Sequence, residues 1–238
     1  MKLPPLTTGR ILRRYKRFLA DIELEEGRVV VAHCPNTGTM ISCWAPGIPV
    51  QISHSDNPRR KLEWTLERVD MGRGWIGVNT HRTNAVIEEG VREGAIPALA
   101  GYACLRREAT FDLPGHPRSR FDLLLSDRSR GEAVVEVKNA TLLDEEVIRF
   151  PDAVTVRGRK HLDALAELKD TGRRAVMLFA VNRPEGRVFA PAWSLDPVYS
   201  RRLVEVAAEG VEVLAVRVVH TDDAMYAKGV VEVDLSGQ

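Results

Sequence analysis

The sequence predicts a protein of mixed α/β class, with a small closed β-barrel followed by a mixed sheet that carries helices. About 80 N-terminal residues hold five short β-branched segments separated by turn residues, which is typical of an OB-like barrel. The remainder alternates strands with helices, as mixed α/β sheets do. Hydrophobic residues make up 44% of the 238 residues and charged residues 28%, so a packed core is feasible. An SH3-like barrel is the alternative for the first part.

The barrel is expected over residues 1–83, as a nucleic-acid-binding domain. Gly27 and the stretch Pro35-Asn36-Thr37-Gly38 are turn signals that divide its strands. The expected strands are residues 9–23, 28–33, 47–53, 62–69 and 75–78.

The second domain is expected over residues 84–238. Its first helix should begin with Asn84 as N-cap and end at Gly94, and a later helix should have Asp196 as N-cap, Pro197 at its first position and Gly210 at its end. A helix over 153–170 should lie between them. The expected strands are residues 102–111, 120–126, 133–140, 175–181, 211–219 and 230–234.

Composition excludes several classes of protein. No apolar run approaches the ~20 residues that span a bilayer, and the N-terminus lacks the apolar region of a signal peptide, so a cytoplasmic protein without membrane contact is expected. The three cysteines lack CxxC spacing. His33 beside Cys34 has no matching second pair, so core or turn roles are favoured over a zinc site.

Basic residues concentrate near the N-terminus. Residues 1–85 hold 13 Lys and Arg against 8 Asp and Glu, whereas residues 86–238 hold 21 against 25. The first part is therefore the side expected to meet a polyanion. Its basic stripe surrounds Tyr15 and Phe18 and consists of Arg13, Arg14, Lys16 and Arg17, preceded by Arg10. Such a stripe can track phosphates while aromatic rings stack on bases, but it is equally compatible with a solvated strand.

The strand expected over 133–140 carries two charges on one face. Alternation places Val134, Glu136 and Lys138 together, with Val135 and Val137 on the opposite, packed face. In the preceding strand, the same alternation groups Asp122 with Arg120 and Leu124, and Phe121 with Leu123 and Leu125. If the two strands pair as a hairpin, Asp122 lies beside Glu136 and Lys138.

Two carboxylates ~4 Å apart repel by ~4 kcal/mol at an effective dielectric near 20, and a divalent cation removes that repulsion. Carboxylates suit Mg²⁺ or Mn²⁺, so Asp122 and Glu136 are candidate ligands, with Lys138 as the catalytic partner. Glu108 is a further candidate ligand, or it pairs with the neighbouring arginines. A half-exposed strand with a surface Glu–Lys pair remains the alternative to a metal site. A second E-x-K, Glu167 to Lys169, lies in the expected helix and cannot form the same site.

Three cationic residues follow in the helix expected over 153–170. Arg157, Lys160 and His161 lie at i, i+3 and i+4 and should share one face. This face could contact the nucleic-acid backbone or be solvated.

Six stretches, in order along the chain, resemble the bacterial and archaeal sugar fermentation stimulation protein family. They are RYKRFLAD (14–21), HCPNTGTM (33–40), GYACLRRE (101–108), SRFDLLL (119–125), VEVKNATL (135–142) and FPDAVTVRGRKHL (150–162). The resemblance implies an OB-like domain joined to a PD-(D/E)XK nuclease-like domain, with Asp122, Glu136 and Lys138 in the nuclease pattern and Glu108 as accessory acid. It also implies non-specific DNA binding and a regulatory link to sugar (maltose) metabolism.

Three functions follow as hypotheses. The first is a Mg²⁺- or Mn²⁺-dependent nuclease, or a protein derived from one. The second is a non-catalytic DNA-binding regulator of sugar metabolism. The third, a sugar-binding module, has no support in the residues. Residues 197–220 are expected to form a helix and then a strand, which argues against a helix-turn-helix there. The sequence leaves the existence of a homodimer open.

Overall fold

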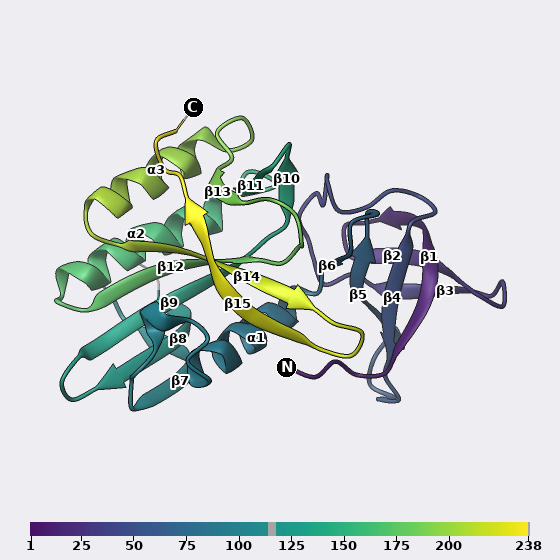
Figure 1. The fold of residues 1–238 in the computed structure, drawn as a ribbon, viewed down its shortest axis with the longest axis horizontal. Helices are drawn as coiled ribbons and strands as arrows, with labels where there is room; N and C mark the ends of the chain where they lie inside the picture. Colours follow the sequence, from purple (N-terminus) through teal and green to yellow (C-terminus); the bar gives the residue numbers. More distant parts are fainter. Residues whose placement is uncertain (114–117, 238) are drawn as a thin grey trace.

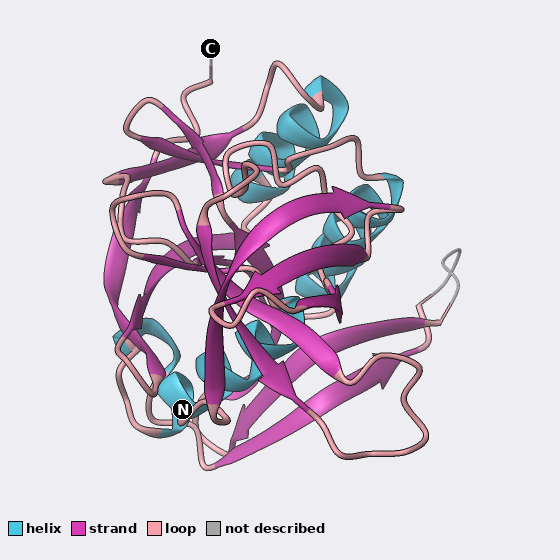
Figure 2. Cartoon of the chain, turned by 90° about the vertical axis from the view of Figure 1, so that its right-hand side faces the viewer, coloured by secondary structure: helices cyan, strands magenta, loops and turns pink. Residues whose placement is uncertain are grey.

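A computed structural model describes residues 1–113 and 118–237 and shows a barrel beside a larger α/β domain (Figure 1). The barrel strands run in the order β3-β2-β1-β4-β5-β6, and β3 pairs with β5 to close the barrel. Figure 2 shows the barrel from the side that faces away from the larger domain. The bounds of these strands are β1 (Leu6–Tyr15), β2 (Leu19–Leu24), β3 (Val29–His33), β4 (Pro49–His54), β5 (Trp64–Asp70) and β6 (Trp75–Gly77).

The barrel forms because alternate residues of its strands point inward. Ile11, Ile22, Val50 and Leu66 are fully buried in one apolar cluster, which Cys34 and Cys43 join. Burial of such side chains contributes ~1.5–3 kcal/mol each. The segment expected as one strand over 9–23 is instead a hairpin. Its turn places Lys16 and Arg17 at positive φ angles of 50° and 66°, where the chain reverses.

The second domain is a mixed sheet of described strands in the order β10-β11-β13-β15-β14-β12-β9-β8-β7. Strands β9, β12 and β14 are parallel neighbours, and β8 pairs antiparallel with β9. The bounds are β7 (Cys104–Phe111), β8 (Ser119–Asp127), β9 (Gly131–Ala140), β10 (Leu142–Asp144), β11 (Val147–Phe150), β12 (Arg174–Val181), β13 (Val188–Pro191), β14 (Glu212–His220) and β15 (Met225–Val233). An OB-like barrel followed by a mixed α/β domain is therefore confirmed.

Helices cover both faces of this sheet (Figure 1). Leu162 and Leu203, from the helices on one face, share a core cluster with Val134 and Phe179. The helix on the other face shares a second cluster with the other side of β9. The helices are α1 (Thr80–Arg92), the short η1 (Pro97–Leu99), α2 (Val156–Asp170) and α3 (Pro197–Ala208).

Several helix boundaries differ from the expected ones. The N-cap of α1 is Asn79, which accepts a hydrogen bond from the His81 amide, so the expected boundary between 83 and 84 falls inside this helix. Asn84 lies one turn further along, where its side chain is free for another role. Thr155 caps α2, which therefore begins at Val156 and not at 153. The expected cap Asp196, with Pro197 after it, is confirmed.

Other elements were not expected from the sequence. Strands β10, β11 and β13 have four residues or fewer, too short to show a period of two. The first residues also leave the barrel, because Lys2 bridges to Ala224 and Leu3 packs in the core of the second domain. Helix α3 followed by β14 is the arrangement expected for residues 197–220, so no helix-turn-helix forms there.

Buried polar contacts join the two domains. Arg68 of β5 is 1% exposed and donates hydrogen bonds to the carbonyl oxygens of Thr221 and Asp222, at 2.6 and 2.8 Å. The amide of Asn139, at the end of β9, donates to the carbonyl oxygen of Gly77 at 3.2 Å. Since charged donors buried on carbonyls are costly to separate, the barrel has a fixed position against the sheet.

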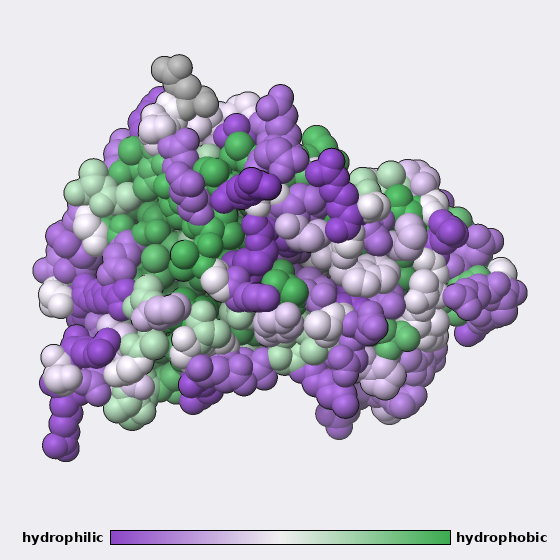
Figure 3. Space-filling model, in the orientation of Figure 1, coloured by the Kyte–Doolittle hydropathy of each residue, from purple (hydrophilic) through white to green (hydrophobic). Residues whose placement is uncertain are grey.

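The surface of the molecule differs between the domains. On the face shown in Figure 3, hydrophobic residues gather over the α/β domain, whereas hydrophilic residues dominate the barrel. Among the described residues, no helix is long and apolar enough to cross a membrane.

Candidate active site

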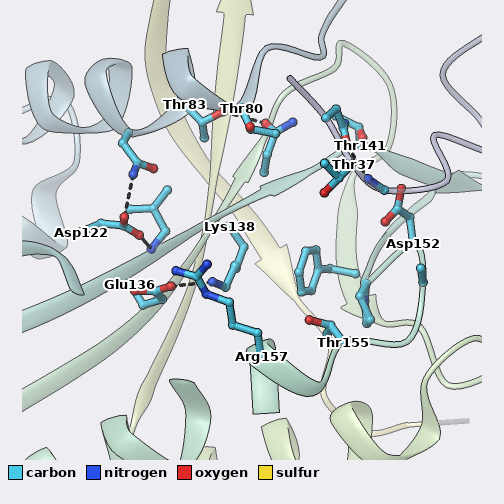
Figure 4. Close-up of a pocket in the computed structure, with 18 of the residues that line it drawn as sticks. Thr37, Thr80, Thr83, Asp122, Glu136, Lys138, Thr141, Asp152, Thr155 and Arg157 are labelled. Carbon is cyan, nitrogen blue, oxygen red and sulfur yellow. Dashed lines mark hydrogen bonds and ion pairs between the residues drawn. The ribbon is translucent and has the colours of Figure 1, made fainter. Parts of the chain in front are cut away.

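A cavity of about 700 Å³ lies between the domains and contains the residues of the expected metal site. Asp122 comes from β8, and Glu136 and Lys138 come from β9 (Figure 4). Helix α1 forms one wall through Thr80 and other residues of its first two turns. The hairpin of β8 and β9 therefore brings the three side chains together.

Asp122 lies where the two strands stop pairing. The β8–β9 ladder ends at Leu123, and the Asp122 carboxylate instead accepts the backbone amide of Val137 at 2.7 Å. Its other oxygen accepts the side-chain amide of Asn84 at 2.6 Å. Strict alternation placed Phe121 and Leu124 on opposite faces of this strand. That expectation is wrong, because both side chains pack in the same core cluster.

Burial is the main reason why Asp122 is a weaker acid than an ordinary aspartate. It raises the pKa of this carboxyl group to about 6, and the nearby charge of Glu136 adds to the effect. The Val137 amide, Lys138 and Asn84 oppose the shift without cancelling it. In the cation-free protein, ionisation of Asp122 therefore costs more than it does for an exposed aspartate, and a nearby cation would lower this cost.

Glu136 is 3% exposed and has two differently placed carboxylate oxygens. Its Oε1 accepts from Lys138 Nζ at 2.5 Å and also contacts His161 Nδ1. Burial alone would raise the pKa of this carboxyl group, but Lys138 and His161 hold it below its usual value. Its Oε2 is buried without a hydrogen-bond partner among the residues that the structure describes.

A divalent cation fits these two carboxylates. A buried oxygen without a partner costs ~1–3 kcal/mol, which cation binding would recover. Mg²⁺ and Mn²⁺ prefer oxygen ligands, and Mg²⁺ uses one or two carboxylates with water and phosphate. Within residues 1–113 and 118–237, no three His, Cys, Asp or Glu side chains form a ready-made metal cluster. Glu108 lines the same cavity, but its carboxylate pairs with Arg120 at 3.1 Å, so its role as a ligand stays a prediction.

The three cations expected on one face of α2 separate in the structure. Arg157 lines the cavity, and its Nε lies 3.4 Å from Nε2 of His161. His161 contacts the Glu136 carboxylate directly, so it supports the site from behind. Lys160 lines a different groove, between α2 and α3, so the single cationic face was wrong for this residue.

A loop of the barrel forms the opposite wall of the cavity. Asn36, Thr37 and Gly38 line it, and Figure 4 shows Thr37 across the cavity from Asp122. The loop is fastened on two sides. Arg14 donates to the carbonyl oxygens of Asn36 and Gly38 at 2.7 and 2.8 Å. Asp152 accepts the backbone amide of Met40 at 2.9 Å and leaves no room for a side chain at Gly38.

Arg14→Ala is expected to loosen this loop. The substitution leaves partly buried carbonyl oxygens without their donor, and hydrogen bonds to charged groups contribute ~1.5–3 kcal/mol. We expect the melting temperature to fall by roughly 4–8 °C, as ~2 kcal/mol does in a chain of this size. Thermal unfolding measures it, with Arg28→Ala as the control because that exposed arginine pairs only with Glu26. An unchanged melting temperature for Arg14→Ala would contradict the fastening role.

The other members of the basic stripe have different positions. Arg13 pairs with Asp21 at 2.6 Å and lies over the Tyr15 ring, outside the cavity lining. Lys16 is exposed in the hairpin turn and is also absent from the lining. Arg17 does line the cavity and has no carboxylate partner among the described residues. Nucleic-acid contact by this stripe stays a prediction, with Arg17 the best placed.

Sequence reasoning missed the residues that complete the walls. Asn84 was assigned to a helix cap, but it holds Asp122. Asp152 and the loop at Asn36 lie far apart in sequence, and only the domain arrangement joins them. Two stretches, PNTG and FPDAV, could have indicated these residues, because they contain turn residues and a carboxylate that belong to no periodic apolar pattern.

Comparisons with known proteins cover nearly the whole chain. Residues 12–78 match the family model described as SfsA N-terminal OB domain, and residues 81–224 match the sugar fermentation stimulation protein RE domain. The sugar fermentation stimulation protein homologue of Acidithiobacillus ferrooxidans is 51% identical over 218 residues, which cover 91% of this chain and 92% of that protein. The homologue of Syntrophotalea carbinolica is 50% identical over 219 residues, with the same coverage.

A solved structure has the same fold. The structure of Pyrococcus furiosus SfsA in complex with Ca²⁺ superposes with a TM-score of 0.88 at 26% identity and covers 98% of both chains. The OB-like barrel is thereby favoured over the SH3-like alternative, in agreement with the matched family model. On the strength of these matches and of the fold, the chain belongs to the sugar fermentation stimulation protein family.

Proposed function

We propose that this protein is a metal-dependent nuclease that hydrolyses phosphodiester bonds in nucleic acid, DNA with little sequence preference being the expected substrate. The observation that carries the proposal is Glu136 Oε2, a buried carboxylate oxygen without a partner among the described residues, in one cavity with Asp122. A carboxyl group with a raised pKa beside an ionised, partly unsatisfied one is typical of a functional site.

Each residue of the site has a role in this proposal. When Mg²⁺ or Mn²⁺ is bound by Asp122 and Glu136, it supplies Lewis acidity at the phosphodiester. Asn84 and the Val137 amide hold Asp122 in place. The Lys138 ammonium, in the same cavity, orients the attacking water and stabilises negative charge on the phosphoryl oxygens. A bond from water oxygen to phosphorus forms and the bond to the leaving oxygen breaks; the attacking water releases a proton to solvent, and the leaving oxygen takes one up from solvent.

Two further features support the proposal. The cavity rim carries Arg17 and Arg157, neither of which pairs with a carboxylate of the described residues, and such cations attract phosphates. The relative from Pyrococcus furiosus was solved with Ca²⁺, an ion that also prefers oxygen ligands.

The direct test is cleavage of single- and double-stranded DNA by the wild-type protein with Mg²⁺ or Mn²⁺. We expect cleavage that stops when EDTA is added and returns with excess Mn²⁺. The variant Asp122→Ala plus Lys138→Ala, purified in parallel, serves as the blank for contaminating nucleases. Cleavage that is equal in the blank, or that persists in EDTA, would refute the proposal.

Mn²⁺ affinity is expected to depend on pH through Asp122. Because its pKa is raised to about 6, a proton competes with the cation below that pH. We expect the affinity to fall about tenfold per unit below pH 6 and to level off above it, since one proton is displaced. Calorimetric titration with Mn²⁺ between pH 5 and pH 8 measures this dependence. An affinity independent of pH over this range would show that Asp122 is not a ligand.

The second candidate function is a non-catalytic DNA-binding regulator of sugar metabolism. The rim cations Arg17 and Arg157, which pair with no carboxylate of the described residues, favour DNA binding because they attract phosphates without any metal. It predicts DNA binding that weakens on Arg17→Ala, remains on Asp122→Ala and is never followed by cleavage. The cleavage test above therefore separates the two functions.

A further inference from the structure

A second hollow adjoins the active-site cavity and is not used in the mechanism. Its volume is about 440 Å³, and it lies between the barrel and the start of α1. Its cationic and imidazole groups are His33 at the end of β3, Arg60 in the loop before β5, and His81 and Arg82 of α1. We call it the barrel groove.

The barrel groove shares one lining residue with the active-site cavity. His81 lines both hollows, and the consecutive residues Pro35 and Asn36 line the groove and the cavity respectively. Thr80 fixes this junction by donating to the Pro35 carbonyl oxygen at 2.7 Å. A chain that leaves the cavity past His81 therefore enters the groove.

The charge of the groove suits a phosphate backbone. Its one carboxylate, Glu67, is 4% exposed and already accepts from Arg82, Ser53 and Asn79. The Arg60 guanidinium donates to Thr65 Oγ1 at 2.6 Å and has no carboxylate partner in the described parts of the chain. Burial lowers the pKa of His33, and the neighbouring His81 and Arg60 lower it further.

The active-site cavity has the size of a single strand. Its volume of about 700 Å³ falls within the ~300–1,000 Å³ of pockets that enclose small ligands, which is room for one or two nucleotides. A duplex is much wider, since its major groove alone measures ~12 Å. The barrel loop cannot simply swing away, because Arg14 and Asp152 fasten it from both sides.

We infer that the substrate is a single strand of nucleic acid, which passes through the cavity beneath the barrel loop and continues along the barrel groove, with Arg60 on its phosphates. The inference rests on the proposed function and names its substrate class. Basic grooves of this kind track single strands without reading their sequence. The exposed Thr37 lines the cavity wall and offers a hydroxyl group to the enclosed nucleotide, whereas the hydroxyls of Thr80 and Thr83 already donate to Pro35 and Asn139.

The test measures binding without divalent metal, so that it does not depend on cleavage. The probes are a fluorescent oligothymidylate of twenty nucleotides, one of four nucleotides, and a blunt duplex of twenty base pairs. We expect Arg60→Ala to weaken binding of the long strand about tenfold and to reduce its salt dependence by ~0.7 in slope, as loss of one phosphate contact does. The short strand, which fills only the cavity, should change less than twofold.

Two variants control for folding and for charge in general. Arg60→Lys keeps the charge and should restore most of the affinity for the long strand. Arg59→Ala removes the neighbouring exposed arginine, which does not line the groove, and should have no effect.

The duplex should bind at least tenfold more weakly than the strand and resist cleavage with Mn²⁺.

Equal binding of the long strand by Arg60→Ala and wild type would overturn the route along the groove. Equal binding and cleavage of the blunt duplex would overturn the single-strand class. If the strand binds as expected but is never cut with Mg²⁺ or Mn²⁺, the nuclease proposal fails while the strand route stands.

Discussion

Asp122→Asn is expected to abolish cleavage and, at neutral pH, to stabilise the metal-free protein. The new amide oxygen can still accept the Val137 amide, and Asn84 can turn its own amide to match, so the site keeps its shape. The negative charge needed for a cation is lost, and we expect cleavage to fall by ~10³-fold or more, as for loss of a principal electrostatic contact.

The gain in stability follows from the raised pKa. The folded state holds a proton on Asp122 up to about pH 6, whereas the ordinary value is 3.8. The folded protein thus binds more protons between these values, and its free energy of unfolding falls as the pH rises through this window. At ~1.4 kcal/mol per unit, the variant avoids a loss of about 2–3 kcal/mol at pH 7.

Thermal unfolding in EDTA measures this difference. We expect the variant to melt roughly 4–10 °C above wild type at pH 7.5, and close to wild type at pH 4. Asp127→Asn is the control, because Asp127 lies at the other end of the same strand and hydrogen bonds from Ser129 lower its pKa. A variant that melts below wild type at pH 7.5 would show that Asp122 serves the fold and not a metal.

Lys138→Met is expected to separate metal binding from chemistry. Lys138 Nζ lies 2.5 Å from Glu136 Oε1, and its charge opposes a cation at the same carboxylate. Removal of this charge should therefore leave the Mn²⁺ affinity unchanged or make it stronger. Single-turnover cleavage should fall ~10²–10³-fold, because the ammonium no longer stabilises the negative charge that develops on the phosphoryl oxygens.

A matched control comes from the second E-x-K of the chain. Lys169 lies at the end of α2, where it pairs with Asp170, and Lys169→Met should cleave like wild type. Parallel Mn²⁺ titration and cleavage assays distinguish the roles. If Lys138→Met loses Mn²⁺ affinity as well, its ammonium organises the carboxylates and does not act on the substrate.

The central part of the site could be predicted because it depends on one hairpin. A period of two places Glu136 and Lys138 on one face, and a short connection brings the Asp122 strand alongside. The same reasoning excluded Glu167 and Lys169 as a second site of this kind, because they were expected in a helix, and the structure confirms that they lie in α2. Local periodicity and pairing therefore determine this region.

The walls of the site could not be predicted, because they arise from contacts between distant segments. Asn84 reaches Asp122 across 38 residues of sequence, and Asp152 meets the barrel loop across 112. Helical spacing also put Lys160 beside His161, but two residues on one face can lie on either side of the packed stripe. No pattern in a single sequence encodes such contacts, because packing between distant segments, within the second domain and between the two domains, creates them.

The proposed chemistry requires that Asp122 and Glu136 together bind a divalent cation. A crystal of the wild-type protein soaked in Mn²⁺ tests it most directly, through the anomalous scattering of the ion. We expect an anomalous peak between the two carboxylates, within bonding distance of Glu136 Oε2. A well-ordered site with no peak there, or with Mn²⁺ bound only elsewhere, would contradict it.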